Sequence, residues 1–421
     1  MRLDTSRFLL TALCLLVAPI GLHAQSPSAD TSSTGVTAMP ADVDSTWEAL
    51  ATDFLRTMEA GGHVGGTLWI AHGGDVLGKE HYGFSDLKSE RRVDDQTIYH
   101  WASITKTLTG IAIMQLRDRG RLSLDDPVVD YLPSLREVHN PHGPMEEITI
   151  RMLLNHTAGF RSPTWPWAGD KEWHPHEPTL WSQLVAMMPY TKIHFEPGTK
   201  VKYSNPGYIF LGQIIEQVSG SEYETYIDKN IFLPLRMDRS YFDTTPRHLL
   251  DHRSNNYVVT AEGDTVANGR DFNTGITVAN GGLNAPVGDM LRYASFLAGT
   301  CEWATCEDVL ERSSLREMWT PAPPQRETDD RGSEDQNEWT GYTGLSFFVL
   351  QQGDVKVVHH TGGQKAYTTL LMLEPEADVA AAIAFNSEGG PDAGEDAEPS
   401  ASSVLREMQR RLITEVFPLF R

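Results

Sequence analysis

Strand-like segments lie at both ends of the chain, and helix-like segments fill its middle. Apolar runs bounded by Gly, Pro or Asp predict strands at residues 65–72, 76–82, 342–351, 355–359, 367–373 and 379–385. Apolar residues at helical spacing predict helices at residues 43–60, 106–120, 150–155, 179–188, 207–219, 223–231, 287–297 and 404–417. This segregation predicts an α+β fold. The two chain ends form one antiparallel sheet, the terminal helices cover it, and a mostly helical lobe at about residues 103–300 is inserted.

Residues 1–24 are typical of a secretory signal peptide. Two arginines precede an almost wholly apolar run at residues 8–22, and a small residue precedes Gln25. The run is shorter than the about 20 apolar residues that a membrane span needs. Residues 25–42 are rich in Ser, Thr, Ala and Pro, which predicts a flexible leader. We therefore expect an exported protein without stable membrane insertion, folded over residues 43–421.

The net charge of the chain, together with its cysteine and histidine residues, limits which macromolecules and metal ions it is expected to bind. The formal net charge of -22 argues against nucleic-acid and anionic-membrane partners, because both require clustered cations. In an exported protein, Cys301 and Cys306 predict a local disulfide, since two ligands alone make no zinc site. Three histidine pairs lack a carboxylate at ligand spacing and are interpreted as solvated loop residues: His139 and His142, His174 and His176, His359 and His360. The sequence thus predicts no metal and no cofactor, and it leaves the oligomeric state open.

Ser103 and Lys106 are three residues apart where the helix predicted at residues 106–120 begins, so their side chains are neighbours. A serine hydroxyl needs a base to become nucleophilic, and a lysine amine serves as one only where its surroundings favour the neutral form. Burial near the positive end of a helix favours that form. The spacing alone is not specific, because Ser85 and Lys88 share it in a predicted polar turn.

Two further segments carry groups that complement a nucleophile. Tyr203 and Asn205 precede a predicted helix; a phenol beside an ammonium acts as general base or acid, and an amide can bond a substrate carbonyl. The alternative is a turn tyrosine with a helix-capping asparagine. Residues 360–363, His-Thr-Gly-Gly, end a predicted strand, where glycine lets a substrate approach the strand edge and a backbone N–H can donate to an oxyanion. The alternative is an ordinary strand-ending turn.

In this order the three motifs resemble the serine beta-lactamase and penicillin-binding-protein superfamily, in its class C-like branch of DD-peptidases, esterases and D-aminopeptidases. The resemblance extends to segments at residues 121–127, 148–160, 203–212 and 281–283, and it spans about residues 47–420. It implies a beta-lactamase/transpeptidase-like fold with its site between sheet and helical lobe.

The resemblance also implies a role for each motif residue. Ser103 is the acylated nucleophile and Lys106 its proton partner, while Tyr203 acts as base in one half-reaction and acid in the other. Whether Lys106 or Tyr203 removes the first proton stays open. The implied substrate-binding residues are Asn205, His360, Thr361, Gly362 and Gly363, with the backbone N–H groups of Ser103 and Gly363 as the oxyanion hole.

One departure from the family pattern bears on the substrate. Many beta-lactamases have lysine where this chain has His360, and a partly neutral histidine holds a carboxylate more weakly. The resemblance therefore implies an exported serine hydrolase that cleaves amide or ester bonds through an acyl-enzyme, with D-amino-acid peptides or carboxylic esters as small-molecule or peptide substrates. A true beta-lactamase is one alternative. A non-catalytic cell-wall or ligand-binding protein that retains the fold is the alternative from another class.

The segment at residues 161–181 is unusual because it contains four tryptophans, Trp165, Trp167, Trp173 and Trp181. We hypothesise that this segment overhangs the acyl pocket and selects apolar substrate groups; packing of the segment onto its own domain is the alternative. Residues 321–338 and 389–402, rich in acidic residues, Pro, Gly and Ser, predict surface insertions.

Overall fold

The computed structural model describes residues 41–160, 178–259, 264–271, 273–301, 306–322, 339–388 and 400–421. The predicted signal peptide, most of the predicted leader and nearly all of both predicted surface insertions lie outside these ranges. So do Trp165, Trp167 and Trp173. Helix α1 (Ala41–Ala60) begins two residues inside the predicted leader.

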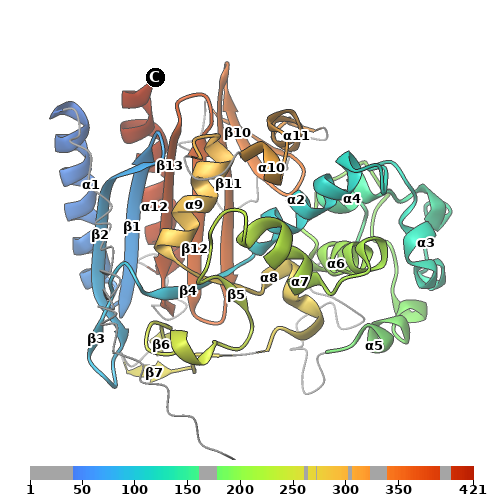
Figure 1. Cartoon of the computed structure of the whole chain (residues 1–421), viewed down its shortest axis with the longest axis horizontal. Helices are drawn as coiled ribbons and strands as arrows, with labels where there is room; N and C mark the ends of the chain where they lie inside the picture. Colours follow the sequence, from blue (N-terminus) through green and yellow to red (C-terminus); the bar gives the residue numbers. More distant parts are fainter. Residues whose placement is uncertain are drawn as a thin grey trace, which may run out of the picture. The chain divides into compact units, whose positions relative to one another are not determined.

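Both ends of the chain contribute to one eight-stranded antiparallel sheet of order β3-β2-β1-β13-β12-β11-β10-β9, as predicted (Figure 1). Strands β1 and β13 are neighbours in this sheet, with Leu68 opposite Ile383. The strands are β1 (Gly65–His72), β2 (Asp75–Asp86), β3 (Arg91–Arg92), β9 (Thr340–Thr343), β10 (Phe348–Gln352), β11 (Val355–Gln364), β12 (Tyr367–Glu374) and β13 (Val379–Phe385).

The sheet is buried on both faces, and successive residues of a strand enter different cores. Leu68 and Ile70 pack into a core shared with α1 and with α12 (Ala401–Arg411). Trp69 and Ala71 belong to the core on the opposite face, which includes α9 (Val287–Ala298). Figure 1 shows α1 and α12 on one side of the sheet and α9 on the other. The C-terminal helix predicted at residues 404–417 is α12 extended by a π-helical turn (Leu412–Val416) and a 3-10 turn (Phe417–Phe420).

The inserted lobe is mostly helical, as predicted. Its α-helices are α2 (Thr105–Asp118), α3 (Val128–Tyr131), α4 (Ile150–Leu154), α5 (Trp181–Val185), α6 (Asn205–Ser219), α7 (Tyr223–Ile227) and α8 (Val278–Gly281), and α10 (Cys306–Val309) and α11 (Arg312–Met318) follow it. Shorter helical turns are Pro133–Glu137, Met145–Glu147, Met188–Tyr190, Asp228–Phe232, Arg247–Leu249 and Gly275–Thr277. The helix predicted at residues 179–188 is thus shorter than expected, and the one predicted at 223–231 changes to a π-helical turn after Ile227.

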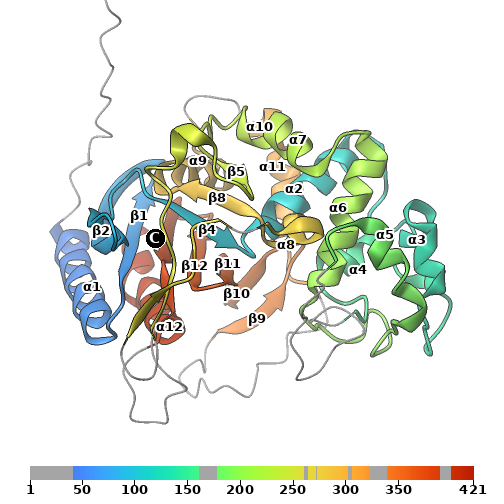
Figure 2. The same ribbon diagram turned by 90° about the horizontal axis from the view of Figure 1, so that it is seen from below.

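Five short strands in and beside the lobe, and one near the C-terminus, were not predicted. β4 (Ile98–Ala102), β8 (Leu283–Pro286) and β5 (Tyr241–Phe242) form one small sheet, and β14 (Ser387–Glu388), β6 (Tyr257–Val259) and β7 (Thr265–Ala267) form another. Strands of two to five residues are too short to show a periodic pattern. Apart from β6 and β7, which pair with each other as a hairpin, their partners lie far away in sequence. In Figure 2, β4 and β8 lie between the main sheet and helices α2 and α8, which is where the candidate site is found.

Two strand predictions are corrected by the structure. The strand predicted at residues 342–351 is the β9–β10 hairpin, which turns at Gly344, where an added Cβ would lie 2.1 Å from the carbonyl oxygen of Met318, and at Ser346, which has a positive φ of 67°. The strand predicted to end at residue 359 continues to Gln364, so the third motif lies inside β11 rather than after it.

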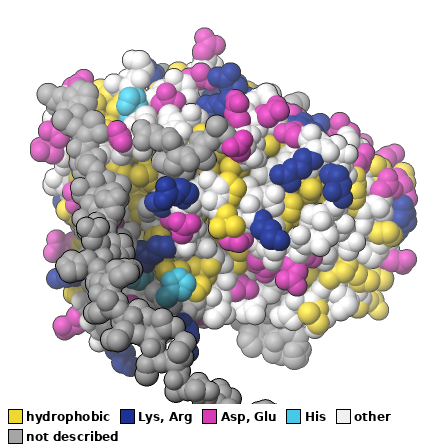
Figure 3. Space-filling view, in the orientation of Figure 1, with side chains coloured by type: hydrophobic (Ala, Val, Ile, Leu, Met, Phe, Trp, Pro, Cys, Tyr) yellow, Lys and Arg dark blue, Asp and Glu magenta, His cyan; other side chains and the backbone are white. Residues whose placement is uncertain are grey.

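The surface of the described part of the chain carries charges of both signs. On the face seen in Figure 3, acidic side chains are spread over most elements with basic side chains between them. Cys301 and Cys306 form a disulfide, which confirms the predicted pairing. Within the described ranges, none of the helices combines the length and the apolar character that crossing a bilayer requires.

Candidate active site

Ser103 lies in the turn that leads from β4 into α2, and Lys106 is in the first turn of that helix. The helix begins at Thr105, one residue before the predicted start, and Ser103 precedes it by two residues. The chain reverses at Ala102, which has a positive φ of 46°, and the Lys106 N–H then donates to the Ser103 carbonyl at 3.0 Å. This turn places the Lys106 Nζ 3.1 Å from the Ser103 Oγ, while the Ser103 side chain remains half-buried. The predicted hydroxyl–amine pair is therefore present.

The environment of Lys106 favours its neutral form. Its side chain is fully buried, and this loss of solvation lowers its pKa well below the ordinary value. The Nζ donates to the backbone carbonyl of Asn280 at 2.7 Å. A neutral amine that donates one hydrogen to this carbonyl keeps a lone pair with which it can accept the proton of Ser103.

Helix α8 and the start of β8 hold α2 in place. The Ala279 carbonyl accepts from Thr109 Oγ1 at 2.6 Å, and the Leu283 N–H donates to Thr105 Oγ1 at 3.0 Å. Together with the Asn280 carbonyl, these bonds fix the helix turn that carries Lys106. Sequence patterns did not identify Asn280. The signal that could have identified it is the adjacent Gly-Gly-Leu segment at residues 281–283, which is one of the segments that resemble the family.

The second motif lies against the same lysine. The Lys106 Nζ is 4.9 Å from the centre of the Tyr203 ring. Ser204 is the N-cap of α6, its Oγ accepting from the Gly207 N–H at 3.2 Å, and Asn205 is the first residue of that helix. Tyr203 is half-buried, with one face of its ring covered by His156 at 4.6 Å between centroids. Serine, lysine and tyrosine thus converge from segments that are 100 residues apart.

The third motif approaches from β11. His360 is buried, its ring centre 6.3 Å from that of Tyr203 and 5.1 Å from that of Phe348. Its Nδ1 lies 2.6 Å from the Thr361 carbonyl oxygen. The interpretation of His359 and His360 as solvated loop residues is therefore wrong, because β11 extends through them and both are buried. β10 pairs with β11 only as far as His359, so among the described strands only β12 pairs with residues 360–364.

The two glycines of the third motif have different surroundings. A Cβ on Gly362 would lie 2.2 Å from the Trp101 carbonyl oxygen and 2.3 Å from Thr369 Oγ1, whereas a Cβ on Gly363 would meet nothing within 4 Å. Gly362 therefore permits β11 to lie directly against β4, two residues before Ser103. Gly363 has open space where a side chain would be.

This contrast gives a matched pair of variants. Gly362→Ala is expected to lose about 1–3 kcal/mol of unfolding free energy and to slow acylation of Ser103, since the added methyl must push β4 away. Gly363→Ala is expected to keep wild-type stability, because its methyl points into open space. Urea unfolding together with the rate of covalent labelling checks both, and equal stability of the two variants would contradict the role given to Gly362.

His100 links the strands behind the nucleophile. Its Nδ1 lies 3.0 Å from Asn284 Oδ1 of β8, and its Nε2 lies 3.0 Å from Gln364 Oε1 of β11. Burial, with a contribution from Arg253, lowers the pKa of His100 to about 4. A neutral imidazole donates through one nitrogen only, so only one of these two side-chain oxygens accepts a hydrogen bond from the neutral ring. Sequence reasoning identified neither Asn284 nor Gln364.

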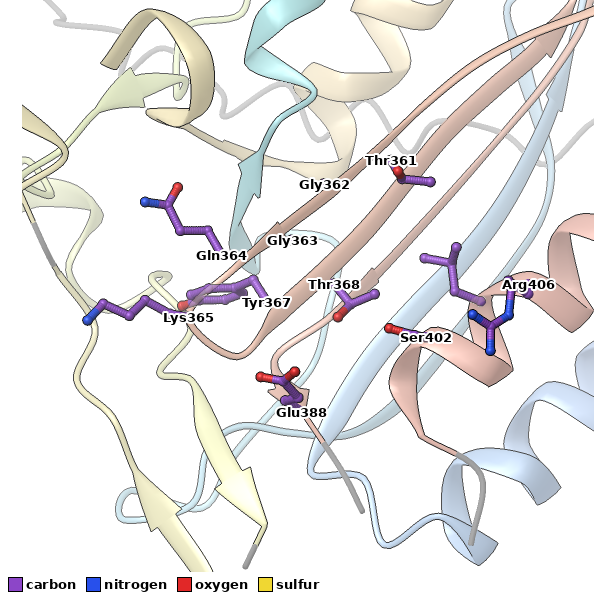
Figure 4. A pocket seen from close by; sticks show the side chains of 11 residues that line it. Thr361, Gly362, Gly363, Gln364, Lys365, Tyr367, Thr368, Glu388, Ser402 and Arg406 are labelled. Carbon is purple, nitrogen blue, oxygen red and sulfur yellow. The ribbon is translucent and has the colours of Figure 1, made fainter. Parts of the chain in front are cut away.

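A cavity of about 500 Å³ adjoins the third motif on the side of α12 (Figure 4). It is lined by Thr361 and Gly363 of β11, by Ser402 and Arg406 of α12, and by Glu388. Ser103 and Lys106 are not among its lining residues, so the cavity does not contain the nucleophile. In Figure 4 the Lys365 side chain points away from α12. Within the described residues no group of three or more His, Cys, Asp or Glu side chains is placed to hold a metal ion.

Comparison with known proteins places this geometry in a family. Penicillin-binding protein 4* of Bacillus subtilis (strain 168) is 28% identical over 322 residues, which is 73% of this chain and 64% of that protein. The chain therefore matches less than two thirds of that relative's length. The octameric penicillin-binding protein homologue from Pyrococcus abyssi has a similar structure, with a TM-score of 0.65 and 26% identity over 82% of this chain and 74% of that one.

A second solved structure shows the same fold at lower identity. The D-amino acid amidase from Ochrobactrum anthropi SV3, complexed with L-phenylalanine amide, superposes with a TM-score of 0.67 at 20% identity, covering 88% of this chain and 98% of that one. Residues 50–405 match the Beta-lactamase family over most of the described fold. The chain belongs to the Beta-lactamase family, whose members are serine hydrolases with the beta-lactamase/transpeptidase-like fold.

Proposed function

We propose that this protein is an exported serine hydrolase that cleaves amide or ester bonds through an acyl-enzyme on Ser103. The observation that carries the proposal is the fully buried Lys106, with its Nζ 3.1 Å from the Ser103 Oγ and 4.9 Å from the Tyr203 ring centre. A binding protein has no need of a desolvated amine beside a hydroxyl, because such an amine costs stability and offers a ligand no charge.

In the first half-reaction the Ser103 oxygen attacks the substrate carbonyl carbon as its proton passes to the neutral Lys106 amine, directly or through Tyr203. The tetrahedral oxyanion accepts hydrogen bonds from the backbone N–H groups of Ser103 and Gly363. The carbonyl re-forms, and the leaving amine or alcohol departs with the proton taken from Ser103. The carbonyl carbon is then bonded to the serine oxygen as an ester.

In the second half-reaction a water molecule attacks this ester. Tyr203 accepts the water proton as it passes its own phenolic proton to the neutral Lys106 amine, and the collapse of the second tetrahedral intermediate returns the proton from Lys106 through Tyr203 to the Ser103 oxygen. The products are the carboxylic acid and the regenerated enzyme. Asn205, at the start of α6, is proposed to bond the amide of the acyl side chain.

The proposed substrates are D-amino-acid peptides or amides and carboxylic esters. His360 stands where many beta-lactamases have lysine, and its ring is packed against Phe348 inside an aromatic cluster. A partly neutral, packed imidazole holds a substrate carboxylate less firmly than an ammonium does. The likeness in fold to a D-amino acid amidase makes D-amino acid amides a suitable test substrate. Export is supported by the predicted signal peptide and by the Cys301–Cys306 disulfide.

A substrate panel tests the proposal. We expect p-nitrophenyl esters, D-alanyl peptides or D-amino acid amides to be turned over with a higher kcat/KM than a chromogenic cephalosporin. We also expect a fluorescent penicillin or a fluorophosphonate to label Ser103 covalently. Faster hydrolysis of the cephalosporin than of every ester and amide would make the protein a true beta-lactamase. Absence of both labelling and turnover would leave a non-catalytic protein with this fold.

A further inference from the structure

His156 occupies an unusual position beneath the second motif. It follows α4, is 2% exposed, and has a positive φ of 63°, a conformation that is uncommon for residues other than glycine. The energetic cost of this conformation must be offset by the contacts that it makes possible.

Those contacts hold the backbone on both sides of Tyr203. The Lys202 N–H donates to the His156 carbonyl at 3.0 Å, and the Ser204 N–H donates to the His156 Nδ1 at 3.1 Å. The imidazole also lies against the Tyr203 ring, with 4.6 Å between centroids. His156 thus binds the residue before Tyr203 through its backbone carbonyl, and the residue after it and the Tyr203 ring through its side chain. Because Ser204 is the N-cap of α6, the same bond also fixes where that helix begins.

The direction of the Ser204 bond sets the protonation state of His156. A backbone N–H can only donate, so the Nδ1 must present its lone pair, and a neutral ring then carries its hydrogen on Nε2. Protonation of Nδ1 would place two N–H groups against each other and break the bond. The ring also lies 5.2 Å from the Tyr208 ring of α6 and 6.2 Å from Phe348 of β10.

The charged and titratable groups around this cluster come from two further elements. Lys106 of α2 lies 4.9 Å and 5.5 Å from the ring centres of Tyr203 and Tyr208, and burial favours its neutral form. His359 and His360 of β11 both pack against Phe348. An imidazolium at residue 156 would therefore lie in an apolar, aromatic cluster, which favours the neutral ring.

We propose that His156, as a neutral imidazole protonated on Nε2, is a positioning residue that holds Tyr203 in its place beside Lys106 and Ser103. The proposal rests on the proposed function, in which Tyr203 transfers protons. His156 itself does not touch the reacting atoms. Its effect on the reaction comes from the Lys202 and Ser204 backbone bonds, since a displacement of about 1 Å in a proton-transferring group can slow a reaction about 10²-fold.

Two substitutions of His156 distinguish the effect of its hydrogen bond to Ser204 from the effect of the space that its ring fills. His156→Ala removes the acceptor and the ring, and it is expected to slow acylation by a fluorescent penicillin about 10²-fold. The affinity of the Ser103→Ala, His156→Ala double variant for the same penicillin should be close to that of Ser103→Ala alone. His156→Asn is expected to recover most of the acylation rate, because its side-chain oxygen can accept from the Ser204 N–H and asparagine tolerates a positive φ.

Tyr208→Phe is the matched control. It removes a buried hydroxyl of the same aromatic cluster, which bonds the Leu154 carbonyl and Ser346 Oγ at 2.8 Å each, and leaves both His156 bonds in place. It is expected to lower Tm and to leave the acylation rate within about twofold of wild type. Wild-type acylation by a folded His156→Ala protein would overturn the proposal. So would an Asn variant as slow as the Ala variant, or a loss of rate in Tyr208→Phe equal to that in His156→Ala.

A measurement that needs no activity completes the test. Nitrogen NMR of the histidine-labelled wild type, with the His156 signals assigned by their loss in His156→Asn, should show an unprotonated Nδ1 and a protonated Nε2 at neutral pH. The opposite tautomer or a doubly protonated ring would overturn the proposal even if His156→Ala does not fold. If wild type is not labelled at Ser103, the proposed function fails, while the tautomer still decides whether His156 holds Tyr203 as described.

Discussion

Replacing Ser103 with alanine is expected to abolish covalent labelling and to lower kcat/KM by about 10⁴-fold or more, because it removes the hydroxyl oxygen that lies 3.1 Å from Lys106 Nζ and forms the proposed acyl-enzyme. Intact-mass spectrometry after incubation with a fluorescent penicillin measures the labelled fraction directly. Wild type should gain the mass of one acyl group, and Ser103→Ala should gain none.

The chain contains a matched control for this experiment. Ser85 precedes Lys88 by the same three residues, but its Oγ donates to the Arg91 and Arg92 carbonyls, and Lys88 is exposed. Ser85→Ala is therefore expected to lose some stability and to be labelled to the same extent as wild type. Full labelling of Ser103→Ala, or loss of labelling in a folded Ser85→Ala protein, would contradict the assignment of the nucleophile.

Replacing Lys106 with methionine is expected to slow acylation by at least about 10³-fold and to change how stability depends on pH. Burial lowers the pKa of Lys106 well below its ordinary 10.5. Between these two pKa values the unfolded chain binds this proton and the folded protein does not, so the free energy of unfolding of wild type rises with pH across that interval. Methionine does not titrate, and its variant lacks this contribution.

The measurable quantity is the difference in unfolding free energy between wild type and Lys106→Met. At neutral pH this difference can have either sign, because the variant also loses the hydrogen bond to the Asn280 carbonyl. As pH rises toward 10.5, the difference should shift in favour of wild type. Urea unfolding of both proteins at several pH values gives this difference. A difference that does not change with pH would mean that Lys106 is charged in the folded protein, and the proposed role as proton acceptor would be wrong.

Sequence patterns predicted the main sheet well where the strands are long and apolar. The boundaries of β1 and β13 were predicted to the residue, since both strands are buried on both faces and end at turn residues. The pattern failed where a strand depends on a distant partner. β4 needs β8, which lies about 180 residues later in the chain, to complete its hydrogen bonds. The hairpin between β9 and β10 was missed for a different reason, because its turn is enforced by contact with Met318 of α11.

The residues of the candidate site divide in the same way. Ser103, Lys106, Tyr203 and His360 were identified from the sequence because each belongs to a short motif with its own chemistry. His156, Asn280 and Gln364 were not, because each acts on a motif from which it is remote in sequence, through one hydrogen bond or a ring contact.

The sequence by itself determined which functional groups are available, in which order they occur, and which faces of the long strands and helices are apolar. Only the tertiary structure decided which of two serine–lysine pairs becomes chemically distinctive. Lys88 and Lys106 have the same spacing from a serine, but Lys88 is exposed, whereas Lys106 is buried against Tyr208 of α6 and Asn280 of α8. The physical reason is that periodicity is a local property, whereas loss of solvation, and with it the basicity of an amine, is the sum of contacts from segments far apart in the chain.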